Sequence, residues 1–524
     1  MLPPSTMTMN GLIELIYSLA LLATLAFSLI QLSMLVMYVF RPRRQQIVPV
    51  APVAGPALPR LTVQLPVFNE VYVIERLIDA VMQLRYPPDK LDIQILDDST
   101  DETTTRIARK LTAYAHTRVT IAHIRRPNRT GYKAGALAYG LPLAKGEFIA
   151  IFDADFIPEP DFLLRAIAHF NRPDIGVVQT RWLHLNENYS LLTQLQAMGL
   201  NAHFVVEQNA RYAGKLFLNF NGTAGIWRKK AILDAGGWQI DTLTEDLDLS
   251  YRAQLKGWQI SYRDDIGVRA ELPVTMNAIK SQQYRWMKGP AECAQKLLGQ
   301  VLSTPDVSLG KKIHACFHLL NSSLFVVILV MSLLSLPVLY SHQSGHWRMT
   351  EALQSLFMLA SVVSLLFWGI PFFQLEWARY RSTAASEPGR RWVGWFRFIW
   401  LYPLFLAVML GLSLHNSLAV LEGHLGIKTP FVRTPKFNVA SQTNAWETNV
   451  YVRQAAVPWL VWLELGLAFY FALGVSLGVY WHDYTMLSFH ALLTVGFGLV
   501  TFYSLSHAYS IRQAEVEPRV VPAV

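Results

Sequence analysis

Long apolar runs lie on both sides of one long stretch of mixed polarity in this chain. Six runs are uncharged or strongly apolar, and they lie at 15–40, 313–341, 352–375, 398–421, 457–481 and 485–509. A helix needs about 20 apolar residues to cross the hydrocarbon core of a bilayer, so each run is long enough to span one. The pattern predicts an integral membrane protein, with residues 11–40 as an N-terminal anchor and a pair of helices in 457–509.

Basic residues near these runs predict how the chain is oriented. No basic residue lies in 1–10, whereas RPRR (41–44) follows the first run. A secretory signal peptide has its basic residues before the apolar run, whereas here they follow it. The run is therefore expected to be retained, with the chain after it in the cytoplasm. Lys311 and Lys312, ahead of the second run, are expected on the same side.

Run 398–421 leaves two alternatives open. It either crosses the membrane, which would place the basic loop 426–439 outside, or lies in the interface and keeps that loop in the cytoplasm. We favour an interfacial helix and a cytoplasmic loop over residues 398–453. Runs 313–341 and 352–375 are expected to cross.

Residues 58–300 have the pattern of a folded domain outside the membrane. Short β-rich runs predict strands at 61–67, 91–97, 119–124, 148–154 and 175–180. Helical patterns lie between them, at 71–84 and 103–115. This alternation predicts an α/β domain with a largely parallel central sheet, in which ligands bind beyond the carboxyl ends of the strands.

The segment IFDADF (151–156) places two carboxylates after an apolar strand. Side chains two residues apart in an extended strand share a face, so Asp153 and Asp155 are expected to point at one ion. Mg²⁺ binds through one or two carboxylates together with substrate phosphates. Any loop can contain two aspartates at this spacing, but their place favours a metal site.

Two other segments carry candidate ligand contacts. ILDDSTD (95–101) puts Asp97 and Asp98 at another strand end, where they could cap a helix or accept from a nucleotide base. NRTGYKAGAL (128–137) combines Lys133 with glycines near a helix start, which suits a phosphate-bearing ligand.

TEDLDLSYR (244–252) has two interpretations. Thr244 followed by acids is typical of a helix start. The functional interpretation makes Asp246 a general base for an attacking hydroxyl, with Asp248 less favoured.

SQQYRWMKGP (281–290) comes shortly before the membrane runs. The simplest interpretation is an amphipathic helix on the membrane surface, with Trp286 in the interface and Lys288 near lipid phosphates.

The formal charge of +9 could suggest nucleic acid, but much of the basic excess borders apolar runs, where anionic lipid explains it better. We therefore expect a lipid bilayer and no nucleic acid as partner. Only Cys293 and Cys316 are present, without metal-ligand spacing, so free buried thiols are expected.

Taken in order, QLPVFNE, ILDDSTD, NRTGYKAGAL, IFDADF, FNGTAGIWR, TEDLDLSYR and QQYRW resemble the membrane-embedded family 2 glycosyltransferases, in particular the cellulose synthase-like A and C groups with their plant mannan and glucan synthases. The resemblance covers about residues 60–300. It implies an α/β catalytic domain of the GT-A type, located in the cytosol and inserted between transmembrane helices. It also implies a nucleotide-diphospho-sugar donor and a divalent metal, Mg²⁺ or Mn²⁺.

Matching motif by motif, the resemblance implies roles for individual residues. Asp97 or Asp98 would contact the nucleotide base, and Lys133 would contact the nucleotide. Asp153 and Asp155 would bind the diphosphate and the metal, and Asp246 with its neighbour Glu245 would be catalytic. The QxxRW residues Gln282, Arg285 and Trp286 would bind the acceptor and the diphosphate. FVRTPK (431–436) is similar to the FxVTxK gating loop of cellulose synthases, and it keeps Phe431, Thr434 and Lys436 in register. A basic loop on the membrane surface is the alternative for that segment.

The leading hypothesis is a processive, inverting transferase that builds a β-linked polysaccharide from UDP-glucose or GDP-mannose type donors and passes it across a plasma, inner or Golgi membrane. The alternative is a non-processive enzyme that adds one sugar to a lipid, as a ceramide glucosyltransferase does. A transporter with a nucleotide-binding domain is a third class, and Glu464 inside an apolar run would mark its pathway.

Overall fold

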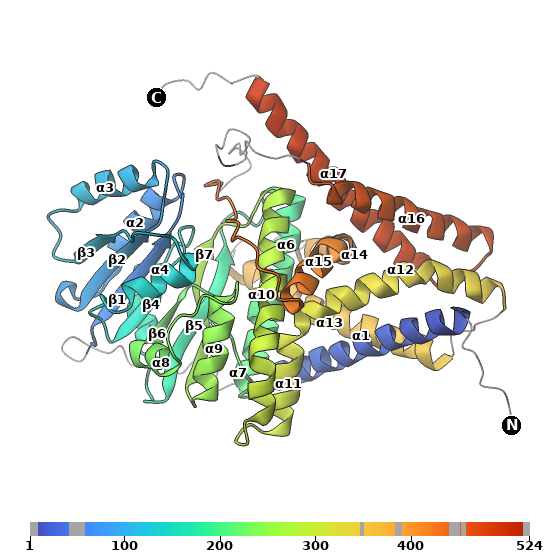
Figure 1. Ribbon diagram of the computed structural model, residues 1–524, viewed down its shortest axis with the longest axis horizontal. Coiled ribbons are helices and arrows are strands. Elements are labelled where there is room, and N and C mark those ends of the chain that lie inside the picture. Colours follow the sequence, from blue (N-terminus) through green and yellow to red (C-terminus); the bar gives the residue numbers. More distant parts are fainter. Residues whose placement is uncertain are drawn as a thin grey trace.

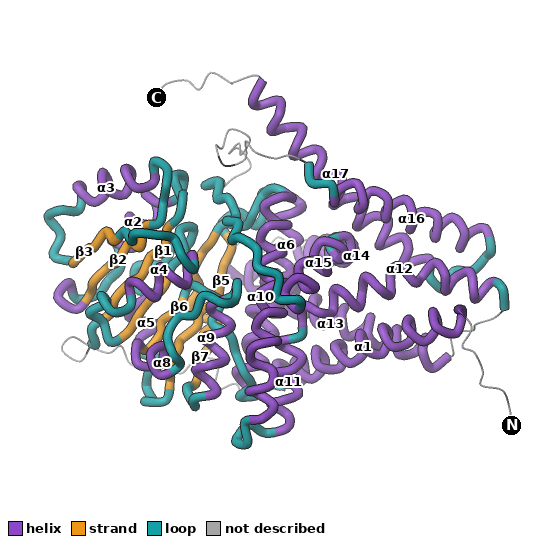
Figure 2. Tube along the Cα trace, in the orientation of Figure 1, coloured by secondary structure: helices purple, strands orange, loops and turns teal. Residues whose placement is uncertain are grey.

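The computed structural model describes residues 9–40, 58–345, 351–382, 390–439, 451 and 457–516. The basic stretch 41–44 and most of the region between 440 and 456 lie outside the described residues. The described part has two halves, an α/β domain and a group of long helices beside it (Figures 1 and 2).

One seven-stranded sheet forms the centre of the α/β domain, with the strand order β3-β2-β1-β4-β6-β5-β7. The strands are β1 Leu61–Val67, β2 Leu91–Asp97, β3 Thr120–Ile124, β4 Phe148–Ile151, β5 Ile175–His184, β6 Gly225–Arg228 and β7 Gln259–Ala270. Strands β1 to β4 pair in parallel, as do β5 and β7, while β6 runs antiparallel to β4 and β5. The predicted α/β domain with a largely parallel sheet is confirmed, although the sequence patterns missed β6 and β7.

Helices cover both faces of the sheet, because its central strands are apolar on both sides. One buried core contains side chains of α2 and α5, including Ile74 and Phe162. The other contains side chains of α4 and α9, including Leu137 and Leu249. The helices of this domain are α2 Ile74–Met82, α3 Thr103–Ala113, α4 Tyr132–Gly140, α5 Phe162–Ile167, α6 Leu191–Ala202, α7 Gln208–Ala213, α8 Lys229–Asp234 and α9 Glu245–Leu255, with a π-helical turn at His203–Glu207 between α6 and α7.

The second half consists of long helices. They are α1 Met9–Val39, α10 Met276–Ser303, α11 Leu309–Leu319, α12 Leu324–Gln343, α13 Glu351–Ser382, α14 Arg390–Gly411, α15 Ser413–His424, α16 Leu460–Tyr480 and α17 Leu487–Val516. Helices α6 and α10 lie where this half meets the sheet domain (Figure 1).

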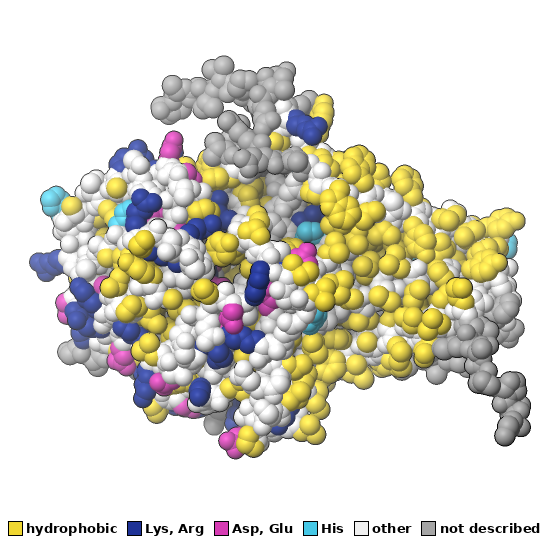
Figure 3. All heavy atoms as spheres, viewed as in Figure 1, with side chains coloured by type: hydrophobic (Ala, Val, Ile, Leu, Met, Phe, Trp, Pro, Cys, Tyr) yellow, Lys and Arg dark blue, Asp and Glu magenta, His cyan; other side chains and the backbone are white. Residues whose placement is uncertain are grey.

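Within the described residues, six helical segments are long and apolar enough to cross a membrane. They are Met9–Val39, Asn321–Gln343, Met358–Arg379, Gly394–Gly411, Leu460–Tyr480 and Leu487–Arg512. Yellow apolar side chains cover this half of the visible surface, and charged side chains gather on the α/β domain (Figure 3). The chain is therefore a membrane protein, as the apolar runs predict.

Two apolar runs are divided in the structure. Run 313–341 contains the end of α11, a 3-10 turn at Asn321–Ser323, and then α12. Run 398–421 is divided between α14 and α15 at Leu412. Helices α14 and α15 are seen close to end-on, whereas α1, α12 and α16 run along the length of the molecule (Figure 1).

Candidate active site

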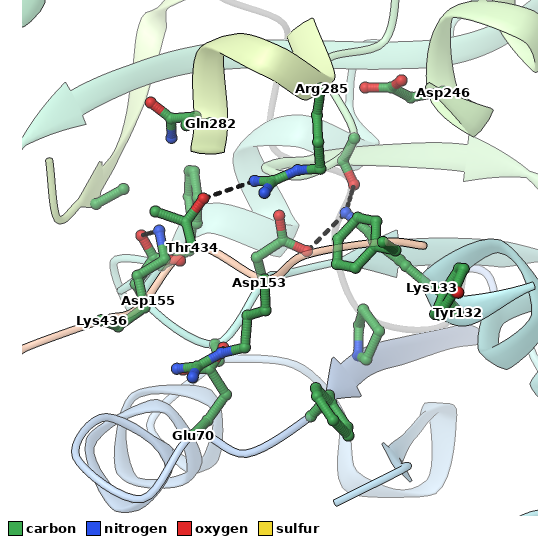
Figure 4. Close-up of a pocket in the computed structure, with 18 of the residues that line it drawn as sticks. Glu70, Tyr132, Lys133, Asp153, Asp155, Asp246, Gln282, Arg285, Thr434 and Lys436 are labelled. Atoms are coloured by element: carbon green, nitrogen blue, oxygen red, sulfur yellow. Dashed lines mark hydrogen bonds and ion pairs between the residues drawn. The ribbon is translucent and has the colours of Figure 1, made fainter. Parts of the chain in front are cut away.

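A cavity of about 230 Å³ lies at the carboxyl ends of β1, β2 and β4. Side chains reach it from the ends of these strands, the starts of α4 and α9, helix α10, and the segment after α15 (Figure 4). Its predicted members are Asp98, Lys133, Asp153, Asp155, Glu245, Asp246, Gln282, Arg285, Trp286, Phe431, Thr434 and Lys436. Ligands bind at this edge in parallel α/β sheets, so the fold and the motifs point to the same place.

Asp153 and Asp155 lie in a turn beyond β4, which ends at Ile151. The assumption that an extended strand aligns them is therefore wrong, although both line the cavity. The Asp153 side chain is 33% exposed, and its Oδ1 is 2.6 Å from Nζ of Lys133. The Asp155 side chain is 3% exposed, and its Oδ2 is 2.7 Å from Nζ of Lys436. Each carboxylate thus faces its own lysine.

Lys133 joins the first aspartate to the acidic start of α9. Its Nζ also donates to the carbonyl oxygen of Gly222 at 3.0 Å and lies 3.8 Å from Oε1 of Glu245. Burial favours the neutral amine, but the carboxylates of Asp153, Glu245 and Asp246 outweigh it and raise the pKa of Lys133. A cation is thereby fixed at the centre of the site.

Glycine is required at position 222. Its φ is +79°, and a Cβ there would lie 3.0 Å from Oδ2 of Asp246 and 3.3 Å from Nζ of Lys133. The turn before β6 therefore approaches the general-base candidate closely without a side chain.

Asp246 is held in an environment that suits a general base. Burial, with the neighbouring Glu245, raises the pKa of Asp246 to about 7. Burial also raises the pKa of Glu245, and Lys133 opposes that shift. A carboxylate with a pKa near the operating pH is matched to accepting a proton. Asp248 lies outside the cavity, fully buried between Arg252 and Lys296.

The two aspartates at the end of β2 occupy different places. Asp97 is buried and bonded to the Ser99 amide, Thr104 and His123, away from the cavity. Asp98 lines the cavity, where Arg126 binds its carboxylate through two nitrogens at 2.7 and 2.5 Å. Of the two candidates for contact with the nucleotide base, only Asp98 reaches the cavity.

Gln282, Arg285 and Trp286 project from α10 into the cavity. Arg285 donates from Nη2 to Oγ1 of Thr434 at 2.7 Å and from Nη1 to the carbonyl oxygen of Val432 at 2.5 Å. Burial lowers the pKa of Arg285 to about 10, which leaves the guanidinium charged at neutral pH.

The segment 426–439, called the pocket loop from here on, lies across the cavity. The Phe431 ring stacks on Tyr132 with centroids 5.3 Å apart. Arg433 donates to Glu70 at 2.9 and 2.7 Å. The predicted set missed both Glu70 and Arg433. Glu70 was detectable from its position after β1, but nothing in the FVRTPK pattern marks Arg433 as its partner.

A second cavity of about 270 Å³ adjoins the first, and Asp246, Trp286 and Asn221 line both. Its further polar lining includes His203, Glu207 and Asn219, and it extends to Asn321 and Ser322 beside the start of α12. Amides, an imidazole and aromatic rings are groups that bind hydroxyl-rich ligands. Asp246 therefore lies between a charged cavity and a second one that leads toward the membrane helices.

The side of α10 away from the cavity corrects one expectation. Lys288 is 0% exposed, so it does not lie among lipid phosphates, and Trp286 faces the cavities instead of a lipid interface. Lys280 is also buried, with its Nζ 2.6 Å from Oε2 of Glu464 on α16. This pairing gives Glu464 a place between helices that needs no transport pathway.

The cysteines are free, Cys293 buried and Cys316 partly buried. Among the described residues no group of three or more His, Cys, Asp or Glu side chains could hold a metal ion by itself.

The fold and this cavity define a GT-A type domain of the kind that binds nucleotide sugars. Residues 59–289 match the family model described as "Glycosyltransferase like family 2", and they form a glycosyltransferase domain of that family.

Curated relatives agree with this class. The chain is 44% identical over 267 residues to "Glucomannan 4-beta-mannosyltransferase 1" of Oryza sativa subsp. japonica, covering 50% of this chain and 51% of that protein. It is 37% identical over 327 residues to "Glucomannan 4-beta-mannosyltransferase 7" of Arabidopsis thaliana, covering 59% of each. The chain spans about half the length of the curated relatives it matches.

Among solved structures, a mannosyltransferase from Pyrobaculum calidifontis in complex with GDP-Man and Mn²⁺ is similar over 78% of this chain and 99% of its own, with 18% identity and a TM-score of 0.47.

Proposed function

We propose that the chain is a processive, inverting hexosyltransferase that extends a β-linked polysaccharide from a nucleotide-diphospho-sugar. The observation that carries the proposal is the convergence of four distant motifs on one cavity. The aspartates after β4, the acids at the start of α9, the QxxRW residues of α10 and the pocket loop all line it. The relatives, described as glucomannan 4-beta-mannosyltransferases, support a β-linked hexose polymer made from a UDP-glucose or GDP-mannose type donor.

In this proposal Asp246 takes the proton of the attacking hydroxyl of the acceptor. The new bond forms between that oxygen and the anomeric carbon, while the bond from this carbon to the diphosphate breaks. Asp246 lies where the two cavities meet, which allows the acceptor to approach from one cavity and the donor to lie in the other. Its raised pKa supports base chemistry near neutral pH.

Lys133 and Arg285 would bind the departing diphosphate. Both are cations held in a protected site, where preorganised donors stabilise developing charge strongly. Asp98 would contact the nucleotide base, and Trp286 would provide the ring on which the acceptor rests.

The residues present fit a divalent metal. Asp153 and Asp155 offer hard oxygen ligands, and Mg²⁺ or Mn²⁺ binding through one or two carboxylates leaves positions for diphosphate oxygens. Such a cation, when bound, supplies Lewis-acid stabilisation of the leaving diphosphate. Asp155 would have to exchange its present contact with Lys436 for that ion.

The membrane helices would hold the domain on the cytosolic face and conduct the product outward. The second cavity supports this arrangement because it leads from Asp246 to the start of α12. Helices α14 and α15 would lie in the interface, which leaves the pocket loop on the cytosolic side, in contact with the cavity.

The test is nucleoside diphosphate release from a panel of UDP- and GDP-hexoses by the purified protein in lipid, with Asp246→Asn as the matched control. We expect release from at least one hexose donor, reduced on the order of 10²–10⁴-fold in the variant. Equal release by both proteins would overturn the assignment of Asp246, and no release from any donor by the unaltered protein would overturn the proposed function.

A further inference from the structure

Helix α10 has a second row of polar side chains besides its QxxRW residues. Lys280, Tyr284 and Lys288 follow one another at intervals of four, so they lie on one face of the helix. This face points away from the cavity that Gln282 and Arg285 line. Lys280 bonds to Glu464 on α16, whereas Tyr284 and Lys288 both bond to the end of α15 and the segment after it, so polar contacts as well as apolar packing hold this face.

Lys288 makes the most extensive of these contacts. Its Nζ donates to the carbonyl oxygen of Ile427 at 2.6 Å and to Oγ1 of Thr429 at 2.7 Å. It also lies 3.4 Å from Oε2 of Glu422 and 3.4 Å from the hydroxyl of Tyr284. An ammonium has three donors, so these acceptors satisfy it. A charge with 0% exposure is tolerated only with such partners, and the contacts are therefore strong constraints on the segment they hold.

The segment held by Lys288 leads directly into the cavity. Thr429 precedes Phe431 by two residues, and Phe431, Arg433, Thr434 and Lys436 line the donor side. The end of α15 is fixed against the same turn of α10. A Cβ on Gly423 would lie 2.7 Å from the Lys288 carbonyl oxygen and 2.8 Å from Cβ of Ala291, so the two helices touch through their backbones.

The pocket loop is thus held at both ends of its cavity contacts. Beyond Lys288, it meets α10 again where Arg285 donates to Thr434, and it meets the sheet domain through Arg433 with Glu70 and Lys436 with Asp155. The Lys288 contact lies outside the cavity, as do the bonds of Lys428 to the Asp241 carbonyl oxygen and of Arg76 to Asn438. Lys288 can therefore hold the loop's register without touching a ligand.

We propose that Lys288 is a positioning residue that fixes the root of the pocket loop to the QxxRW helix, so that the loop's cations meet the donor site in one register. The proposal rests on the proposed function in one respect only, that the cavity binds a nucleotide sugar. Without this anchor the loop would leave the cavity more often. Weaker donor binding is then expected, with a smaller effect on the rate at saturating donor.

The experiment uses trypsin as a probe of the loop in the full-length protein in lipid, because Lys428, Arg433 and Lys436 are cleavage sites inside the loop. We compare Lys288→Met with Lys256→Met, a control at an exposed lysine after α9. Cleavage after Lys428, Arg433 and Lys436 is expected to be on the order of tenfold faster in Lys288→Met, with sites outside the loop unchanged, and the KM for donor is expected to rise by a similar factor. Cleavage and KM equal to those of the control would overturn the proposal.

Two further variants separate anchoring from general stability. Lys288→Met/Glu422→Leu removes both charges, so its thermal stability is expected to exceed that of Lys288→Met while the loop stays open to trypsin. Thr429→Val removes a single acceptor and is expected to accelerate loop cleavage by a smaller factor in the same direction. If the double variant regained normal loop protection, Lys288 would act through charge balance alone and the proposal would be wrong. Because cleavage needs no donor, absence of sugar transfer by the unaltered protein would refute the proposed function and leave this result intact.

Discussion

Nζ of Lys133 lies 2.6 Å from Oδ1 of Asp153, and the same ammonium lies 3.8 Å from Oε1 of Glu245. One cation thereby connects the metal-ligand candidates to the acids at the start of α9. Three carboxylates, those of Asp153, Glu245 and Asp246, act on this one lysine, and a divalent cation bound by Asp153 would offset their excess of negative charge.

Removal of divalent metal is therefore expected to abolish sugar transfer. Treatment with a chelator should stop nucleoside diphosphate release, and added Mg²⁺ or Mn²⁺ should restore it. Asp153→Ala should lower release by about 10²–10³-fold even with metal present, because it removes a ligand of the cation that would stabilise the leaving diphosphate. Glu102→Ala, at an exposed carboxylate of the same domain, is the control. Full activity in chelator would contradict the metal assignment.

The pH dependence should report the pKa of Asp246. This pKa is raised to about 7, so the carboxyl is protonated and inactive below that pH and becomes an effective base above it. The value of kcat/KM should accordingly rise with pH up to about 7 and then level off.

Glu245→Gln removes the like charge beside Asp246, which should ease its ionisation and move this rise to lower pH. If kcat/KM of Glu245→Gln rose over the same pH range as that of the unaltered protein, the charge of Glu245 would not affect the pKa of Asp246.

Arg285 and Trp286 should affect different substrates. Arg285→Ala removes a donor to the departing diphosphate, so kcat should fall about 10²–10³-fold. Trp286→Ala removes an aromatic ring that lines both cavities, so acceptor use should suffer more than donor binding. Donor affinity measured by nucleotide binding, together with transfer at varied acceptor concentration, separates the two. If both variants only reduced membrane association, α10 would be a surface helix and no part of the site.

The ion pair between Lys280 and Glu464 should fasten α10 to α16. Loss of one partner leaves a buried charge unpaired, so Lys280→Met should reduce the free energy of unfolding by about 3–5 kcal/mol. Lys280→Met/Glu464→Leu should recover much of this loss, since neither charge remains. Thermal unfolding in detergent measures both, and equal destabilisation in the single and double variants would contradict the pairing.

The sequence predicted those parts of the structure that depend on local patterns. Strands β1, β2 and β3 begin and end within a residue of their predicted bounds, because apolar β-branched runs bounded by polar residues mark them. Strands β6 and β7 were missed. The four residues of β6 lie in the Gly-rich segment NFNGTAGIWR (219–228), which is typical of a turn, and β7 includes RDD (263–265), which no apolar strand pattern would contain.

The site was partly predictable for a related reason. Residues that follow strands, such as Asp98 and Asp153, could be placed at one edge of the sheet from topology alone. Contacts between distant segments could not. The pairing of Arg433 with Glu70 and the burial of Lys288 depend on how the pocket loop and α10 pack. In the sequence, Arg433 and Lys288 look like ordinary basic residues at a membrane surface.

The length and linkage of the product show whether the protein polymerises hexoses. The full-length protein in lipid would be incubated with the hexose donor it turns over fastest, and the product would be separated by size and analysed for glycosidic linkage. We expect β-linked chains of many hexose units, whose formation depends on Asp246. A product with one sugar on a lipid would contradict it.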